Sequence, residues 1–190
     1  YLKHMEQELV NRPPRKKRLR MLLHRAAVAM ILRERHGDVE LLMIKRSERD
    51  GDPWSGHMAF PGGRMDPTDR HGFDVAVRET AEEIGLQLGA EEPCVGRLSE
   101  IMTHFQWGRR AMVVTPYVFR LEREVEFELN HEVAEVIWVP LSFLKNPDNV
   151  EKMVWTRRGV EIPLSCYMYK GRRIWGLSLM MLGELLKILE

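Results

Sequence analysis

Gly62–Leu86 reads GGRMDPTDRHGFDVAVRETAEEIGL, a double-glycine turn followed by a segment with the periodicity of a helix. Over residues 73–85 the apolar side chains recur on one side of a 3.6-residue period, so we expect a helix there. The acidic residues Glu79, Glu82 and Glu83 share its other face. The segment therefore predicts an amphipathic helix that packs by its apolar side and presents three carboxylates beside a tight turn.

These three carboxylates are candidates for a metal site. Like charges at such spacings repel by only a few tenths of a kcal/mol (about 0.2–0.5) on an exposed helix, so an ordinary solvated acidic face is the alternative. A hard divalent cation takes oxygen ligands, and Mg²⁺ commonly bridges carboxylates to substrate phosphates. Such an ion also activates water and neutralises charge on phosphorus.

The order of these residues closely resembles the box of the Nudix hydrolase family, G-x5-E-x7-R-E-U-x-E-E-x-G-U, where U is apolar. The second half of the box matches at Arg78, Glu79, Glu82, Glu83, Gly85 and Leu86. Thr80 stands at the first apolar position. In the first half, one inserted residue makes Gly63 the box glycine and Asp69 its acidic residue, with Asp66 as a second candidate.

The resemblance implies the fold class α/β (α+β), a Nudix-type α/β/α sandwich in which helices cover both faces of a mixed β-sheet. The residue patterns agree, because strand-like and helical segments alternate without a linker or repeat. Residues 26–33 and 39–45 are expected to form a hairpin, followed by a loop, a short strand within 57–60 and a turn at 61–63. Further strands are expected at 97–104, 111–121 and 133–139, and an amphipathic helix at 174–189.

The resemblance also implies roles for the residues of the box. Glu79, Glu82 and Glu83 would bind one or more Mg²⁺ or Mn²⁺ ions, with the backbone carbonyl of Gly63 as a further ligand. Arg78 would orient the glutamates through charge-assisted hydrogen bonds without touching the substrate.

The implied reaction is hydrolysis of a nucleoside diphosphate linked to another moiety. A water molecule would lose a proton to one of the box glutamates, or to Glu132 or Glu135 of a later segment, and attack a phosphorus in line. The alternative interpretation of the later two glutamates is ordinary charge at a turn and a strand edge.

Upstream of the box, the chain resembles the coenzyme A pyrophosphatase-like subgroup, whose pattern is L-L-T-x-R-S-x3-R-x3-G-x3-F-P-G-G. Arg46-Ser47 matches one end, and Gly56 followed by Phe60–Gly63 matches the other. The middle of the pattern does not match, and Arg49 replaces the inner arginine only after a shift of the loop. With the closing Arg173–Gly176, this pattern favours coenzyme A or an acyl-CoA, which would yield adenosine 3′,5′-bisphosphate and a pantetheine phosphate.

Other nucleoside diphosphate derivatives are alternatives, namely ADP-ribose, sugar nucleotides and NADH. Trp54, Phe105 and Trp107 are predicted in loops where an aromatic ring could stack on a base, with ordinary loop packing as the alternative. The candidate substrate residues are Arg46, Arg49, Trp54, Phe60 and Trp107.

Two other classes of function stay open. One is a non-catalytic Nudix-like module that binds a nucleotide, although a pure binder needs no three acids at this spacing. The other is an RNA 5′-end pyrophosphohydrolase that uses the basic stretch Arg12–Arg20, which we interpret instead as a solvated lead-in. A nucleic-acid partner is therefore not expected, and a homodimer is allowed by the resemblance.

Length and composition set the remaining expectations. The 190 residues, 44% of them hydrophobic, suit one domain, which we place at residues 25–190 after a basic lead-in at 1–24. Residues 1–4 are interpreted as a tag remnant before a start at Met5. No apolar run approaches the ~20 residues of a membrane span. The two cysteines, Cys94 and Cys166, suggest neither a disulfide framework nor a zinc site, which favours the cytoplasm.

Overall fold

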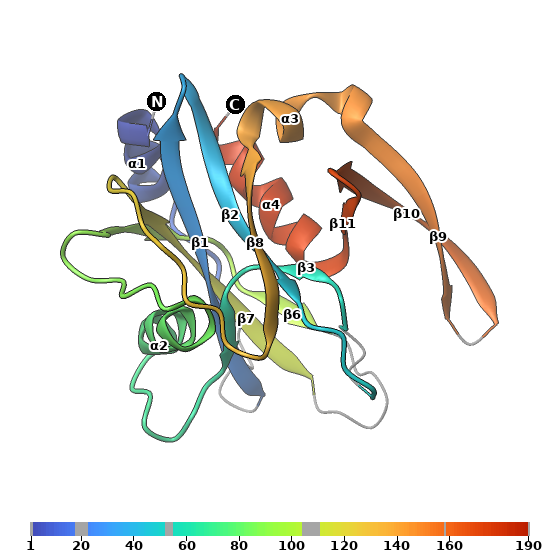
Figure 1. Ribbon diagram of the computed structural model, residues 1–190, viewed down its shortest axis with the longest axis horizontal. Coiled ribbons are helices and arrows are strands. Elements are labelled where there is room, and N and C mark those ends of the chain that lie inside the picture. The colour runs from blue at the N-terminus through green and yellow to red at the C-terminus, as the bar shows by residue number, and fades with distance from the viewer. Residues whose placement is uncertain (1, 18–22, 52–54, 104–110, 158, 190) are drawn as a thin grey trace.

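The computed structural model contains a central sheet with helices on both faces and a smaller sheet that projects at one end (Figure 1). The described residues are 2–17, 23–51, 55–103, 111–157 and 159–189. Within them, no helix combines the length and the apolar character needed to cross a membrane.

The central sheet is mixed, because β1 (His24–Arg35) runs antiparallel to β2 (Asp38–Arg46) and parallel to β7 (Met112–Arg120). Its other strands are β3 (Met58–Ala59), β4 (Gly62–Arg64), β5 (Cys94–Arg97), β6 (Ile101–Thr103) and β8 (Val133–Pro140). The main path is β3-β2-β1-β7-β5, with β4 on β1, β6 on β7 and β8 on β2. His36 and Gly37 both adopt a positive φ in the tight turn that closes the predicted hairpin of β1 and β2.

Strand β1 shows why helices are needed on both faces of the sheet. Its side chains alternate, so each face of the strand carries its own buried apolar row. Ala27, Ala29 and Ile31 belong to the apolar cluster of α2 (Gly72–Ile84). Ala26, Met30 and Leu32 belong to the cluster formed with α1 (Leu2–Asn11), α3 (Leu141–Lys145) and α4 (Gly176–Ile188). The predicted α/β/α sandwich is confirmed.

Helix α2 forms where the sequence predicts it. Val75, Ala76 and Ile84 are buried on its apolar face, and Gly85 ends it with a φ of 71° that favours glycine. Thr80 is also fully buried, and its hydroxyl donates to the Ala76 carbonyl at 2.7 Å. The polar side chain at the apolar box position is therefore satisfied within its own helix.

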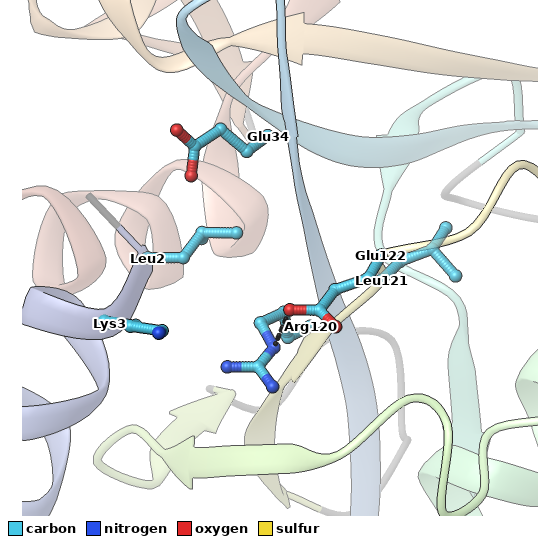
Figure 2. A pocket seen from close by; sticks show the side chains of 6 residues that line it. All are labelled: Leu2, Lys3, Glu34, Arg120, Leu121 and Glu122. Carbon is cyan, nitrogen blue, oxygen red and sulfur yellow. Dashed lines mark ion pairs between the residues drawn. The ribbon is translucent and has the colours of Figure 1, made fainter.

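Helix α1 is an element that the sequence interpretation did not include. Leu2, Met5 and Leu9 are buried in the core, and Leu9 packs against Gly96 of β5. A shallow hollow beside this helix is lined by side chains of α1 and of the ends of β1 and β7, where Arg120 pairs with Glu122 (Figure 2). None of the three box glutamates lines the hollow. The domain boundary at residue 25 stays a prediction.

The smaller sheet follows the central one and was also not foreseen. It has the order β11-β10-β9, with β9 (Val150–Arg157) and β10 (Val160–Tyr169) forming a long hairpin that β11 (Arg172–Ile174) extends. A 3₁₀ turn at Pro147–Asn149 leads into it from α3. In Figure 1 the tip of the hairpin points away from the body, whereas β11 lies next to β3.

Two predicted elements differ from the structure in detail. The turn expected at 61–63 includes the start of β4, since Gly62 and Gly63 pair with Val28 and Ala27 of β1. The single strand expected at 97–104 is two short strands, β5 and β6, which pair with different parts of β7. The predicted strands at 111–121 and 133–139 and the helix at 174–189 match β7, β8 and α4.

Candidate metal and diphosphate site

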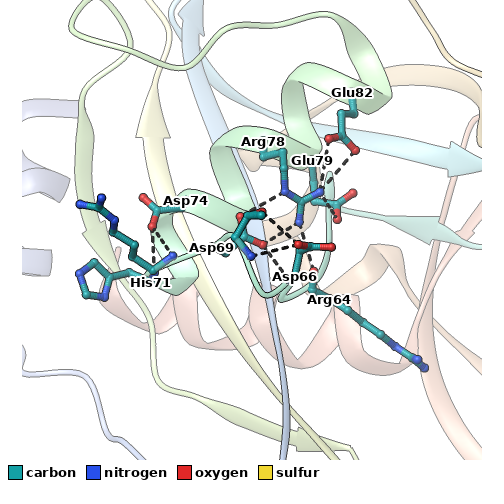
Figure 3. A network of polar contacts seen from close by, with 10 residues as sticks. Arg64, Asp66, Asp69, His71, Asp74, Arg78, Glu79 and Glu82 are labelled. Carbon is teal, nitrogen blue, oxygen red and sulfur yellow. Dashed lines mark hydrogen bonds and ion pairs between the residues drawn. The ribbon is translucent and has the colours of Figure 1, made fainter.

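Arg78 lies at the centre of a polar network at the surface of α2 (Figure 3). Its Nε and Nη2 donate to Oδ1 and Oδ2 of Asp69 at 3.1 and 2.8 Å. Its Nη1 donates to Glu79 Oε1 at 2.9 Å and lies 3.4 Å from both carboxylate oxygens of Glu82. These contacts raise the pKa of Arg78, with the hydrogen bond that Arg78 donates to Asp69 as the largest cause. One guanidinium thus holds three carboxylates in place.

The two loop carboxylates of the first half of the box have different surroundings. The Asp69 side chain is 4% exposed, and its hydrogen bonds to Arg78 lower its pKa against the opposing effect of burial. Asp66 is exposed and accepts from the backbone amide of Thr68 at 3.0 Å. Asp69 therefore acts on Arg78, and Asp66 organises the loop.

Gly63 lies directly against Glu79. A Cβ atom at residue 63 would fall 2.3 Å from Glu79 Oε1 and 2.5 Å from its Cδ, so only glycine lets the two approach this closely. The backbone of β4 and the Glu79 carboxylate are thereby brought together. Burial raises the pKa of Glu79, and the nearby Glu82 and Glu132 add to that effect, while Arg78 opposes it.

Glu83 is the most buried of the box glutamates, with 3% of the residue exposed. Its Oε2 accepts from the backbone amide of Gly62 at 2.9 Å. The pKa of Glu83 is raised to about 8, mainly by burial; the charges of Glu79 and Glu132 contribute to the rise, whereas the Gly62 amide and the charge of Arg46 oppose it. A carboxylate this poorly hydrated gains from a cation at its free oxygen.

Glu82 differs from its neighbours because its side chain is 56% exposed. The three glutamates share a helix face, as predicted, but their exposure to solvent differs. It rises from the buried Glu83 through Glu79 to the exposed Glu82. The expectation that this face simply displays its acids is therefore wrong for Glu83, because β4 covers it.

Glu132, in the turn directly before β8, lies close enough for its charge to act at the same place. Its charge acts on Glu79 and Glu83, and its Oε1 is 3.8 Å from Arg49 Nη1. Its backbone carbonyl accepts from Ser47 at 2.8 Å, beside Arg46, whose charge acts on Glu83. The structure thus brings residues of the upstream pattern and of the later segment to the helix glutamates.

The other candidates lie elsewhere. Glu135 is engaged with Arg172 of β11, whose Nε lies 2.9 Å from Glu135 Oε2 and whose Nη2 also pairs with it. Phe60 is 3% exposed and belongs to the core cluster on the α4 side, so its ring supports the turn from within. Trp54, Phe105 and Trp107 lie outside the described residues.

The donor set suits a hard divalent cation, because it consists of carboxylates, of which Glu79 and Glu83 have raised pKa values, and because the backbone of Gly63 lies against Glu79. Among the described residues no three acidic, histidine or cysteine side chains already converge on one point. Arg78 holds the carboxylates of Glu79 and Glu82, whereas the Gly62 amide holds that of Glu83.

Two features of the site were missed by the sequence interpretation. It assigned Asp69 to the loop position without its pairing to Arg78, and it gave the Gly62 amide no role. The signal for the first was present, since a carboxylate nine residues before an arginine on an acidic helix suggests an ion pair. The second is a backbone contact between β4 and α2, which no side-chain pattern reveals.

Comparison with known proteins places this geometry in a family. The model of the NUDIX domain matches residues 23–158. The chain is 40% identical over 111 residues to the uncharacterized protein C14C4.10c of Schizosaccharomyces pombe, covering 57% of this chain and 34% of that protein. It is 30% identical over 149 residues to the peroxisomal coenzyme A diphosphatase NUDT7 of Mus musculus, covering 76% of this chain and 58% of that protein. It is 32% identical over 164 residues to the mitochondrial coenzyme A diphosphatase NUDT8 of Homo sapiens, covering 85% of this chain and 67% of that protein.

The chain thus spans between about a third and two thirds of the length of these relatives. Among solved structures, a MutT/nudix family protein from Enterococcus faecalis aligns with a TM-score of 0.59 at 16% identity, covering 99% of this chain and 69% of that one. A NUDIX hydrolase from Alicyclobacillus acidocaldarius aligns with a TM-score of 0.52 at 18% identity, covering 64% of this chain and 81% of that one. These alignments agree with the observed sandwich, and together with the family model they show that the chain belongs to the NUDIX domain family.

Proposed function

We propose that this protein is a divalent-metal-dependent pyrophosphohydrolase that cleaves the diphosphate linkage of a nucleoside diphosphate derivative. The observation that carries the proposal is that two glutamates of one helix and a third glutamate from a distant part of the chain lie close enough for their charges to interact. Glu132, in the turn directly before β8, acts through its charge on Glu79 and Glu83 of α2, which lie beside the glycines of β4. Placing the buried Glu83 next to the largely buried Glu79 and near the charge of Glu132 is unfavourable without a cation, so a structural role alone does not account for the arrangement.

Glu79, Glu82 and Glu83 are the proposed ligands of Mg²⁺ or Mn²⁺, and the carbonyl of Gly63, whose backbone lies against Glu79, is a proposed further ligand. The ion would activate water and neutralise charge on the diphosphate. Arg78 fixes Glu79 and Glu82 in position through its hydrogen bonds, and its own orientation is fixed by Asp69.

Glu132 is the proposed general base. Unlike the three box glutamates, it does not belong to the helix, and Arg49 Nη1 lies 3.8 Å from its Oε1. A carboxylate held near a cation by a loop rather than by a helix is free to turn toward a water molecule and accept its proton. Arg46 and Arg49, which flank this group, would bind the phosphates of the substrate.

Coenzyme A or an acyl-CoA is the proposed substrate. Arg46-Ser47 lies beside Glu132 and ends β2, so the residues of the upstream pattern stand at the edge of the site. Two relatives with about 30% identity are named coenzyme A diphosphatases, which favours this substrate over ADP-ribose, sugar nucleotides and NADH. We propose the cytoplasm as its compartment, supported by two free cysteines, although those relatives are named as peroxisomal and mitochondrial.

A product screen tests the proposal. The purified protein with Mg²⁺ or Mn²⁺ is incubated with coenzyme A, acetyl-CoA, ADP-ribose, NADH, sugar nucleotides and 5′-triphosphate RNA, and products are identified by mass spectrometry. We expect coenzyme A to yield adenosine 3′,5′-bisphosphate and a pantetheine phosphate. Glu83→Gln should lower turnover by about 10²–10⁴-fold, whereas Glu91→Gln, at an exposed residue paired with Arg123, should not. Binding without cleavage of any compound would make the protein a nucleotide-binding module.

A further inference from the structure

The smaller sheet gathers aromatic side chains on one face. Trp155 of β9 lies opposite Ile162 of β10, and Arg173 of β11 lies opposite Met168 of β10. Because Ile162 and Met168 are an even number of residues apart on one strand, Trp155 and Arg173 share a face of the sheet. Trp175 follows Arg173 by two residues in extended backbone, so its side chain lies on that face as well.

His57, which precedes β3 in the central sheet, completes an aromatic cluster with these residues. The His57 and Trp175 ring centroids are 5.1 Å apart with an angle of 64° between the ring planes. The Trp155 and Trp175 centroids are 6.1 Å apart at 60°. Tilted contacts of this kind join the edge of one ring to its neighbour and do not stack the faces against one another. All three residues are half-buried, so part of the cluster reaches the solvent.

This cluster stands at the rim of the candidate site. The His57 carbonyl accepts from the Arg46 amide at 3.0 Å, and the Glu132 carbonyl accepts from the Ser47 amide at 2.8 Å. Strands β3 and β8 pair with the same end of β2, one on each of its edges. Two strand spacings of about 4.8 Å each therefore place the backbone of His57 roughly 10 Å from the backbone of Glu132. That separation lies within the span of one nucleotide derivative bound across the site.

The cluster is held firmly in relation to the site. In the first turn of α4, the Ser178 hydroxyl donates to the Met58 carbonyl of β3 at 2.9 Å and is itself buried. Three residues after Met58 the chain reaches Pro61, whose carbonyl accepts from the Ala29 amide of β1 at 2.8 Å just before β4. The strand that carries His57 is therefore fixed both to α4 and to the turn that holds the box glutamates.

We propose that Trp155, Trp175 and His57 form a platform that stacks on the nucleobase of the substrate. The proposal rests on the proposed function, in which that substrate is a nucleoside diphosphate derivative. A planar base gains from stacking on aromatic faces, and Arg173 places an exposed cation on the same face for the phosphates that accompany the base. The smaller sheet is thus a specificity element added to the catalytic sandwich.

Equilibrium binding tests the platform without requiring turnover. Calorimetric titration compares AMP with ribose 5-phosphate, which lacks the base. We expect the protein to bind AMP more tightly, and Trp175→Leu and Trp155→Leu each to weaken AMP binding by about 5- to 150-fold while leaving ribose 5-phosphate unchanged. Trp175→Phe should keep most of the advantage, because it retains an aromatic face.

Tyr169→Leu is the matched control, because Tyr169 lies on the opposite face of the same sheet and packs on Phe143. It should bind AMP like the unchanged protein. Any one of three results would overturn the proposal. The control could lose as much AMP binding as the tryptophan variants, or the unchanged protein could bind AMP and ribose 5-phosphate equally. The third such result is normal AMP binding in both tryptophan variants. If base-dependent binding behaves as expected but no diphosphate is cleaved, the platform stands and the hydrolase function fails.

Discussion

Arg78 and Asp69 are joined by two parallel hydrogen bonds, of 3.1 Å from Nε to Oδ1 and 2.8 Å from Nη2 to Oδ2. A bidentate contact fixes the plane of the guanidinium as well as its position. The remaining Nη1 is then aimed at Glu79, 2.9 Å away. Asp69 therefore influences the box glutamates through Arg78.

Arg78→Lys should disturb the site without unfolding the protein. A lysine keeps the charge but cannot make the paired contact with Asp69, so Glu79 loses its fixed orientation. We expect kcat to fall about 10- to 100-fold, the apparent Mg²⁺ affinity to fall with it, and KM for the nucleotide to change little. Asp69→Asn should shift the same quantities in the same direction. Steady-state kinetics over a Mg²⁺ series makes the measurement, and an unchanged kcat in Arg78→Lys would contradict this role.

Gly63→Ala should act on Glu79 by contact. The added Cβ falls 2.3 Å from Glu79 Oε1, and because that atom ends a flexible side chain, Glu79 moves and the backbone stays. We expect activity to fall at least about 10-fold, with a loss of stability below roughly 2 kcal/mol. Gly89→Ala is the control, since nothing lies within 4 Å of its Cβ. Activity assays and urea unfolding of both variants check this, and equal activity in the two would refute it.

Glu132→Gln and Glu135→Gln should separate the two candidates for the general base. Glu132 acts on the charge of Glu79 and Glu83, whereas Glu135 is engaged with Arg172 of the smaller sheet. We therefore expect kcat to fall about 10²- to 10⁴-fold in the first variant and less than about 10-fold in the second. Comparison of kcat at saturating substrate decides between them. A larger fall in kcat for Glu135→Gln than for Glu132→Gln would make Glu135 of β8 the general base.

The proposed helix ligands could be recognised in the sequence because their chemistry is local. Glu79, Glu82 and Glu83 lie on one helix, and helical periodicity alone places them on one face. The hairpin of β1 and β2 could be predicted for the same reason, as its apolar runs and its turn are contiguous in the chain. The central sandwich followed from these elements and the family resemblance.

The contacts that organise the site depend on long-range packing, which periodicity does not encode. The burial of Glu83 requires β4 to pair with β1 and lie across α2. The engagement of Glu135 requires the smaller sheet, whose strands have alternating polar and apolar residues too weakly patterned to recognise in the chain. The cluster of His57, Trp155 and Trp175 joins three segments that only the tertiary fold brings together.

Glu83 also makes the stability of the metal-free protein depend on pH. Its carboxyl has a pKa of about 8 in the folded chain, against 4.5 for an ordinary glutamate. Between these values the folded state binds the proton more tightly than the unfolded state does, so the free energy of unfolding falls as pH rises from about 4.5 to about 8. The group is neutral in both states below that window and charged in both above it.

Glu83→Gln removes this dependence, because a neutral amide replaces an acid that must ionise while buried. In the presence of a chelator, we expect the variant to gain stability relative to the unchanged protein between pH 5 and pH 8, by on the order of 2–4 kcal/mol. Glu79, whose pKa is also raised, is present in both proteins and so cancels to first order in the comparison. Urea unfolding at several pH values measures the difference, with Glu82→Gln as a control at an exposed position of the same helix. Parallel stability curves for Glu83→Gln and the unchanged protein would mean that Glu83 is not held in a poorly hydrated place, and the physical basis of the proposed metal site would be lost with it.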